Sequence, residues 1–84
     1  MIAWTDFDEL ALEEKISVLY EQGTFVMAIR YYRYKVNLYL LEDYYLEVFV
    51  SHKYSLIEKI IPLDPTHTRM KFYSDQIKLK IDGF

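Results

Sequence analysis

The chain has 84 residues, which suffice for one domain and leave no room for a second. Its composition is 52% hydrophobic and 18% aromatic with only two Gly and two Pro, which excludes disordered, collagen-like and linker sequences. Cysteine is absent, no apolar run approaches the roughly 20 residues that span a bilayer, and acidic residues come too early for a signal peptide. We therefore expect a single cytoplasmic α+β domain over residues 1–84, with no membrane contact.

Residues 6–22 have the pattern of an amphipathic helix. Thr5 or Asp6 can cap its N-terminus, and Gly23 supplies a stop at its C-terminus. Acidic residues crowd the first turns, where the helix dipole favours them. The apolar positions predict one buried face at helical spacing, made of Leu12, Ile16 and Leu19, with Phe7, Ala11 and Val18 beside them.

From Thr24 onward the sequence changes to β-branched and aromatic residues with period-two alternation. Four strands are predicted, over residues 24–31, 34–41, 44–50 and 56–61. Because the connections between them are short, an antiparallel meander is the expected topology. In the first strand we expect Phe25, Met27 and Ile29 to face the core.

A second helix is predicted over residues 65–76. Asp64 and Pro65 have the residue types of an N-cap and of a first helical position. Its buried face is expected to carry three apolar residues, Met70, Tyr73 and Ile77. Residues 78–84 are expected to be extended or frayed. The predicted fold is thus an N-terminal helix, a four-stranded antiparallel β-meander and a C-terminal helix.

The hairpin over residues 34–50 admits two registers, which differ in the length of its loop. A two-residue turn at Glu42-Asp43 would place Leu38 opposite Glu47 and mix polar with apolar residues on both faces. A three-residue loop over residues 41–43 makes one face wholly apolar, pairing Tyr34, Val36, Leu38 and Leu40 with Val50, Val48, Leu46 and Tyr44. Since a one-residue slip moves every side chain to the other face, we expect the segregated register, with Asp43 at positive φ.

The same hairpin resembles the core of a family of short, uncharacterised bacterial proteins. Its sequence from Leu38 to Phe49, LYLLEDYYLEVF, is similar to the family pattern LYxLxGxYxEVx, which one helix precedes and another follows. Asp43 stands where the family tends to have Gly, a residue that suits a left-handed position. The resemblance implies the same order of elements and brings no activity with it.

Signals for catalysis and metal binding are scarce. The serines lack a nucleophile-elbow context, and no Gly-rich phosphate loop is present. His52 and His67, expected in a turn and in the first turn of the second helix, are too few to hold zinc without further ligands. We therefore expect a protein that is not an enzyme, with no catalytic residues, no metal and no cofactor.

Charge is spread unevenly along the chain. Residues 1–23 have six acids and one base, a net charge of −5, whereas residues 24–41 have three bases and no acid, a net charge of +3. In the segregated register, the sheet face away from the core is aromatic and mildly basic. Tyr, Phe and Arg are typical anchors of subunit interfaces. This face is the candidate interface, with the residues Arg30, Lys35, Tyr39, Tyr45, Glu47 and Phe49.

These features predict a small non-enzymatic interaction or structural module that self-associates through this face, as a homodimer, or that binds another protein. Arg30 and Glu47 are expected to form a surface ion pair, within one chain or across the two-fold axis. The alternative is a weak single-stranded nucleic-acid-binding module that uses Arg30, Arg33, Lys35 and the aromatic side chains of the face. The net charge of −3 favours a protein partner. Cover of the face by the C-terminal segment is the third option.

Overall fold

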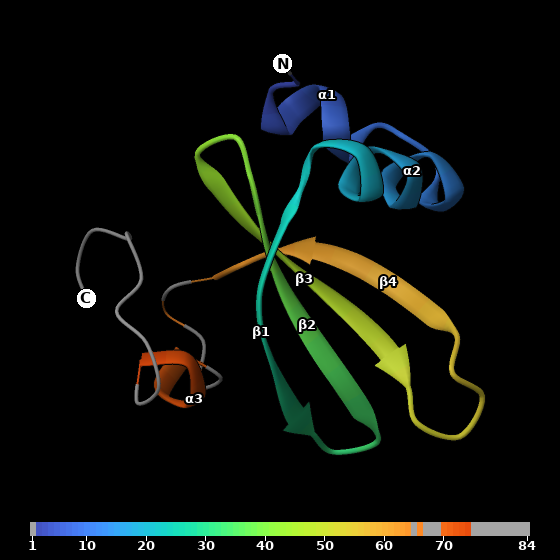
Figure 1. Cartoon of the computed structure of the whole chain (residues 1–84), viewed down its shortest axis with the longest axis vertical. Helices are drawn as coiled ribbons and strands as arrows, with labels where there is room; N and C mark the ends of the chain where they lie inside the picture. The colour runs from blue at the N-terminus through green and yellow to red at the C-terminus, as the bar shows by residue number, and fades with distance from the viewer. Residues whose placement is uncertain (1, 65, 67–69, 75–84) are drawn as a thin grey trace.

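A computed structural model of the chain describes residues 2–64, 66 and 70–74. Its four strands have the bounds β1 Thr24–Tyr31, β2 Tyr34–Leu41, β3 Tyr44–Ser51 and β4 Ile57–Pro62. They form one antiparallel sheet in the order β1-β2-β3-β4 (Figure 1). The α+β class and the antiparallel meander are therefore confirmed, and each strand begins and ends within one residue of its predicted bounds.

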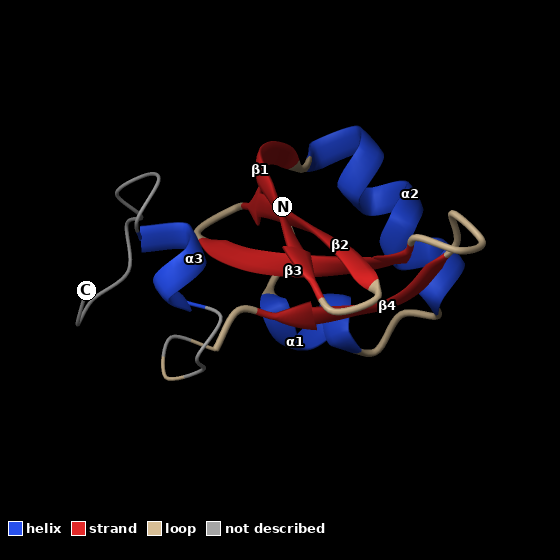
Figure 2. Ribbon diagram, turned by 90° about the horizontal axis from the view of Figure 1, so that it is seen from below, coloured by secondary structure: helices blue, strands red, loops and turns tan. Residues whose placement is uncertain are grey.

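Helices cover both faces of this sheet. On one side, which we call the α2 face, α1 (Trp4–Asp8) and α2 (Leu12–Gln22) bury a cluster of Phe7, Leu19, Leu41, Leu46, Val48 and Ile60. On the other side, the α3 face, α3 (Met70–Ser74) completes a cluster of Met27, Ile29, Val36, Leu38, Phe49, Met70 and Tyr73. Figure 2 shows α2 and α3 at opposite sides of the molecule with the sheet between them. The two central strands are therefore buried from both sides.

The register between β2 and β3 differs from the prediction. Leu38 pairs with Glu47, and the turn has two residues, Glu42 and Asp43. Positive φ falls on Glu42, at 55°, and not on Asp43. The segregated register is the better one only for a sheet with one wetted face. Because helices cover both faces here, apolar side chains on either face are buried, and the shorter turn is adopted.

The predicted helix over residues 6–22 is in fact two helices, with a break at residues 9–11. In one continuous helix, Phe7 and Ile16 would point in opposite directions, about 180° apart at 3.6 residues per turn. The break allows Phe7 to turn toward the sheet, where its side chain is fully buried. The amphipathic stripe therefore describes α2 alone, and Phe7 packs independently of it.

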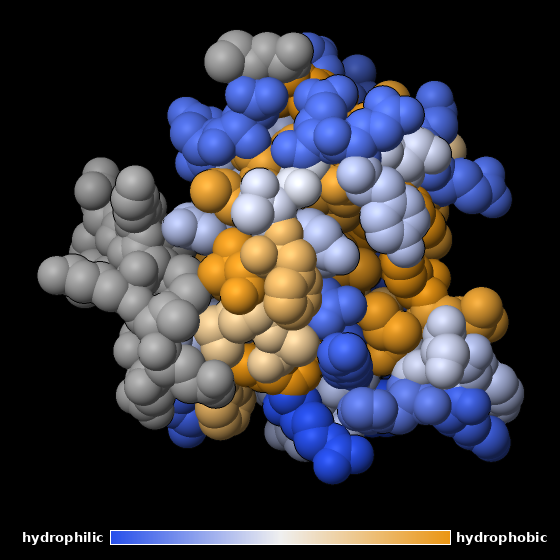
Figure 3. Space-filling view, in the orientation of Figure 1, coloured by the Kyte–Doolittle hydropathy of each residue, from blue (hydrophilic) through white to orange (hydrophobic). Residues whose placement is uncertain are grey.

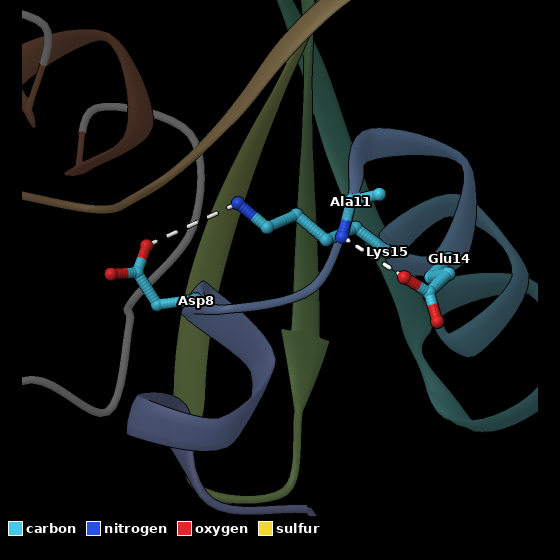
Figure 4. Close-up of polar contacts among 4 residues, drawn as sticks. All are labelled: Asp8, Ala11, Glu14 and Lys15. Atoms are coloured by element: carbon cyan, nitrogen blue, oxygen red, sulfur yellow. Dashed lines mark hydrogen bonds and ion pairs between the residues drawn. The ribbon is translucent and has the colours of Figure 1, made fainter.

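Ala11 is the N-cap of α2, and no side chain of its own can bond the helix terminus. Glu14 compensates by accepting a hydrogen bond from the Ala11 N–H at 3.2 Å (Figure 4). Lys15, one residue further, reaches back across the break to Asp8, with 4.0 Å between Nζ and Oδ1. The Glu14 hydrogen bond caps α2 alone, whereas the Lys15–Asp8 contact joins α2 to α1. The predicted capping residues lie inside α1, which begins at Trp4.

Gly23 ends α2 as predicted, although for a different reason from the one expected. Its φ is −81°, so no left-handed conformation is required. Its N–H donates to the carbonyl oxygen of Leu19 at 2.9 Å. A Cβ at Gly23 would lie 2.8 Å from that same oxygen. Glycine is needed here because the chain passes too close to the last helical turn for a side chain.

A β-bulge at Val26 redirects one predicted core residue. Met27 pairs with Leu38, but the register shifts between Phe25 and Met27, so that Phe25 pairs with Tyr39. Phe25 is 53% exposed and is not part of the core. Its ring packs edge-on against Tyr39, with 5.7 Å between the ring centroids. Met27 and Ile29 are buried as predicted.

The predicted second helix, residues 65–76, is represented by α3 in the part of the chain that the structure describes. Met70 and Tyr73 are buried on the α3 face, as predicted. Ile77 and the predicted tail over residues 78–84 lie outside the described residues. Within residues 2–64 and 70–74, no helix has the length and apolar character needed to cross a membrane.

Candidate interaction surface

The six residues of the candidate interface do not share one face of the sheet. Arg30, Lys35 and Tyr39 lie on the α2 face, because Arg30 pairs with Lys35 and alternates with Ile29 of the α3 face. The other three, Tyr45, Glu47 and Phe49, lie on the α3 face. The cause is the two-residue turn, which moves β3 by one residue against β2 relative to the predicted register. The interface predicted from the sequence is therefore wrong as a single surface.

Glu47 and Phe49 are buried within the chain, with exposed fractions of 0% and 2%. The Tyr73 hydroxyl of α3 donates a hydrogen bond of 2.9 Å to Oε2 of Glu47. The Lys59 ammonium lies 4.6 Å from the centroid of the Phe49 ring. Since Arg30 lies on the opposite face, the predicted ion pair between Arg30 and Glu47 is also wrong. Glu47 instead ties α3 to the sheet.

The exposed aromatic and basic residues gather at one end of the sheet, around two turns. The hydrogen bond from the His52 N–H to the Arg33 carbonyl oxygen, 3.1 Å, joins the β1–β2 turn to the β3–β4 turn. Tyr32 and Tyr54 project from these turns with exposed fractions of 86% and 63%. We call this surface the basic end, and its residues are Arg30, Tyr32, Arg33, Lys35, Lys53 and Tyr54. It lies at the bottom of Figures 1 and 3.

The cations of the basic end are only partly balanced by nearby acids. Arg30 and Lys35 are direct partners across β1 and β2, a like-charge pair that disfavours folding. Arg33 donates from Nη2 to the Tyr34 hydroxyl at 3.3 Å, and that hydroxyl donates to Oε1 of Glu58 at 3.1 Å. The hydrogen bond from Arg33 to Tyr34, together with the charge of Glu58, raises the pKa of the Arg33 guanidinium. The basic end thus carries four cations, and its net charge is +3 when Glu58 is counted with them.

The opposite end of the sheet is acidic. Asp6 from α1 and Glu42 and Asp43 from the β2–β3 turn surround a shallow hollow beside Tyr44. The Tyr44 hydroxyl donates to the carbonyl oxygen of Ile2 at 2.9 Å. Burial, followed by the charges of these three acids, raises the pKa of the Tyr44 hydroxyl. We call Asp6, Glu42, Asp43 and Tyr44 the acidic end, which lies near α1 in Figure 1.

Sequence reasoning missed the exposed residues of the basic end, Tyr32, Lys53 and Tyr54. A usable signal was present: in a meander, the first and third turns lie at the same end of the sheet, and both turns here contain a Tyr beside a cation. The expected surface was a flat sheet face, and the turns were not predicted to be part of it. The order of the strands, rather than their side-chain alternation, brings these residues together at one end of the sheet.

Among the described residues, no group of three or more His, Asp or Glu side chains is placed to hold a metal ion. His52 lies in the β3–β4 turn, whereas His67 is outside the described residues. Charged and aromatic side chains are prominent among the exposed residues at the two ends of the sheet, and such groups are common at recognition surfaces. Comparison of the chain with protein-family models, curated proteins and solved structures finds no match.

Proposed function

We propose that the protein is a non-enzymatic interaction module that pairs with a second copy of itself. In this dimer the basic end of one chain lies against the acidic end of its partner, and the two-fold axis makes the contact reciprocal. The observation that carries the proposal is the opposite charge at the two ends of one small sheet. This surface takes the place of the sheet face that the sequence suggested.

Within one chain the two ends are too far apart to neutralise each other. The eight residues of β2 separate them by about 23 Å at 3.3 Å per residue. Exposed charges are largely screened beyond about 8–10 Å at physiological ionic strength. Each end is thus an uncompensated patch, and a partner in antiparallel orientation would supply the opposite charge at both ends at once.

The basic end also offers apolar area. Tyr32 and Tyr54 are mostly exposed, and Lys53 lies 5.3 Å from the centroid of the Tyr54 ring. Tyr and Arg are enriched among the residues that dominate binding energy at interfaces. Charge complementarity would then orient the two chains and accelerate their encounter, while the tyrosines would supply the buried area. Pairing would also offset the small core of an 84-residue chain by mass action.

Paired charge reversals test the proposal. Arg33→Glu with Lys53→Glu changes the basic end from +3 to −1, and Glu42→Lys with Asp43→Lys changes the three carboxylates of the acidic end from −3 to +1. Each double variant alone should be monomeric in analytical ultracentrifugation, because like charges meet. An equimolar mixture of the two should recover dimers, because every contact is again complementary. Reversal of Glu13 and Glu21, exposed residues of α2 that belong to neither end, is the control and should leave the mass unchanged.

A monomeric parent protein at about 100 μM and low salt, a concentration that would reveal even micromolar affinity, would refute the dimer. So would a mixture of the two reversed variants that stays monomeric. High salt should weaken the parent dimer, since exposed charges at a contact rim are screened.

A second function is favoured by the same end of the sheet. Tyr32 and Tyr54 flanked by Arg33 and Lys53 combine rings that can stack on bases with cations that can contact phosphates. A single-stranded nucleic acid would bind there with strong salt dependence. The reversal of Arg33 and Lys53 should abolish that binding, whereas the reversal of Glu42 and Asp43 should not. The second result separates this function from self-association, which both reversals disrupt.

A further inference from the structure

A cavity of about 220 Å³ lies between α2 and the sheet. α2 contributes Ile16 and Tyr20 to its wall, and the α2 face of the sheet contributes Asn37, Tyr39 and Val50. Ser55 from the β3–β4 turn closes one side. None of the residues that line it is charged. The cavity is distinct from the basic end and the acidic end and plays no part in the proposed dimer.

One polar atom of Asn37, a residue that lines this cavity, is unexplained. The Oδ1 atom of Asn37 is buried and has no hydrogen-bond partner among the described residues. Asn37 pairs with Ala28 on one side and Val48 on the other, so its backbone is fixed at the centre of the sheet with its side chain toward α2. Buried polar atoms are nearly always paired in folded proteins, and an unpaired one calls for a specific reason.

We propose that the cavity binds a small uncharged molecule with an apolar body and one N–H or O–H donor, which bonds to Oδ1 of Asn37. The absence of charged lining residues excludes an ionic ligand, because nothing would pair its charge. Since a dry apolar cavity of about 150 Å³ accepts benzene, this one fits a molecule on the order of ten non-hydrogen atoms. Phenols, indoles and short amides have the required chemistry.

The mouth of the cavity supports a flat ligand. Tyr20 lines the cavity and is 74% exposed, so most of its ring is not packed against the protein. Tyr39 also lines the cavity and is half-buried. Aromatic pairs favour offset or edge-on arrangements, and Tyr39 already meets Phe25 in this way. A ring entering the cavity can therefore contact Tyr39 while its donor bonds to Asn37, whose side-chain amide must turn to present Oδ1, because that atom is buried in the free protein.

Indole and benzofuran form a matched pair of probes, because the two have the same shape and differ in a ring N–H against a ring oxygen. Titration of each into the protein, followed by amide NMR shifts, should show saturable indole binding on the order of 1 mM. The shifts should centre on Asn37, Tyr39 and Val50. Benzofuran should bind at least about tenfold more weakly, since its oxygen would face the Asn37 oxygen without a proton between them.

Two variants complete the test. Asn37→Leu removes the acceptor while keeping the side-chain volume, and it should bring the affinities for the two probes together. Ile16→Trp fills the cavity from the α2 side and should abolish the binding of both. Equal affinities of the parent protein for the two probes, tighter binding of benzofuran, or no saturable shift at about 10 mM would each overturn the proposal. The comparison on the parent protein decides the matter even if a variant fails to fold.

Discussion

The hydrogen bond from Tyr73 to Glu47 offers the sharpest test of the fold, because it exists only if the observed register and the position of α3 are both right. Both side chains have an exposed fraction of 0%, and their oxygen atoms are 2.9 Å apart. Tyr73→Phe deletes the donor and leaves the rest of the ring in place. Removing such a bond to a buried carboxyl group should cost about 1–3 kcal/mol. For a chain of this size, with a total stability on the order of 5 kcal/mol, that is a large fraction.

Urea unfolding followed by fluorescence of Trp4 provides the measurement. Trp4 contacts Phe7 and Tyr44, with ring centroids 6.3 and 6.0 Å away, so it reports on the opposite face of the sheet and hence on global unfolding. With a slope of about 1 kcal/mol per M, Tyr73→Phe should lower the midpoint by about 1–3 M. Tyr20→Phe, which removes an exposed hydroxyl, is the control and should change nothing.

A double-mutant cycle with Glu47→Leu isolates the pair from other contacts of Glu47. The double variant should be more stable than the sum of the single effects predicts, because replacing both polar partners leaves neither half of this hydrogen bond buried and unpaired. A coupling energy below about 0.3 kcal/mol would mean that Glu47 does not meet Tyr73. That result would contradict either the observed register or the position of α3.

Further expected outcomes follow from the same melts. Leu38→Ala should cost about 2–5 kcal/mol, because the side chain is fully buried. Gly23→Ala should cost about 1–3 kcal/mol, because the new Cβ would crowd the Leu19 carbonyl oxygen, whereas Glu42→Gly should stabilise by about 0.5 kcal/mol by relieving positive φ. The raised pKa of Tyr44 means that the folded protein holds this proton more tightly than the unfolded chain. Stability should thus fall as the pH rises above about 10, less so for Tyr44→Phe, and a flat profile in the parent protein would contradict this.

The strands were predictable from the sequence because local chemistry decides them. Runs of β-branched and aromatic residues broken by short polar turns specify a meander without knowledge of what covers it. The predicted bounds even left two residues, 42 and 43, between the second and third strands. The segregation of polar from apolar faces then argued for a longer loop, and that argument rests on the environment of the sheet rather than on the chain itself.

That environment is tertiary and was not visible in the sequence. Covering both faces makes Leu38 and Val48 buried residues on opposite sides, although the prediction placed them on one. It also allows Glu47 to lie in the core, because Tyr73, twenty-six residues later, supplies a donor. A Glu in an alternating strand is expected to be exposed to solvent, because carboxylates are seldom buried without a partner. Only the hydrogen-bond partner on α3 reverses that expectation.

The candidate interface failed for the same reason, since one residue of slip separates Arg30 from Glu47 by the thickness of the sheet. The uneven distribution of charge in the sequence is also present in the structure, because it depends on the order of the strands and not on which face a side chain occupies. Residues 24–41 carry +3 in the sequence, and the turn that follows β1 brings Arg33 next to the β3–β4 turn. The sequence pattern therefore predicted the position of the basic residues better than it predicted which side chains share a face of the sheet.

The helices that cover the two faces of the sheet come from opposite ends of the sequence. α1 and α2 precede the strands, and α3 follows them. During synthesis from the N-terminus, the α2 face can close as soon as β4 has emerged from the ribosome. The α3 face, with Val36, Leu38 and Phe49, must wait for Met70 and Tyr73. Until then the nascent chain displays an apolar sheet surface of the kind that chaperones bind and that promotes aggregation. Slow translation between β4 and α3 would prolong this exposure, so the yield of native protein should depend on the speed of that short interval.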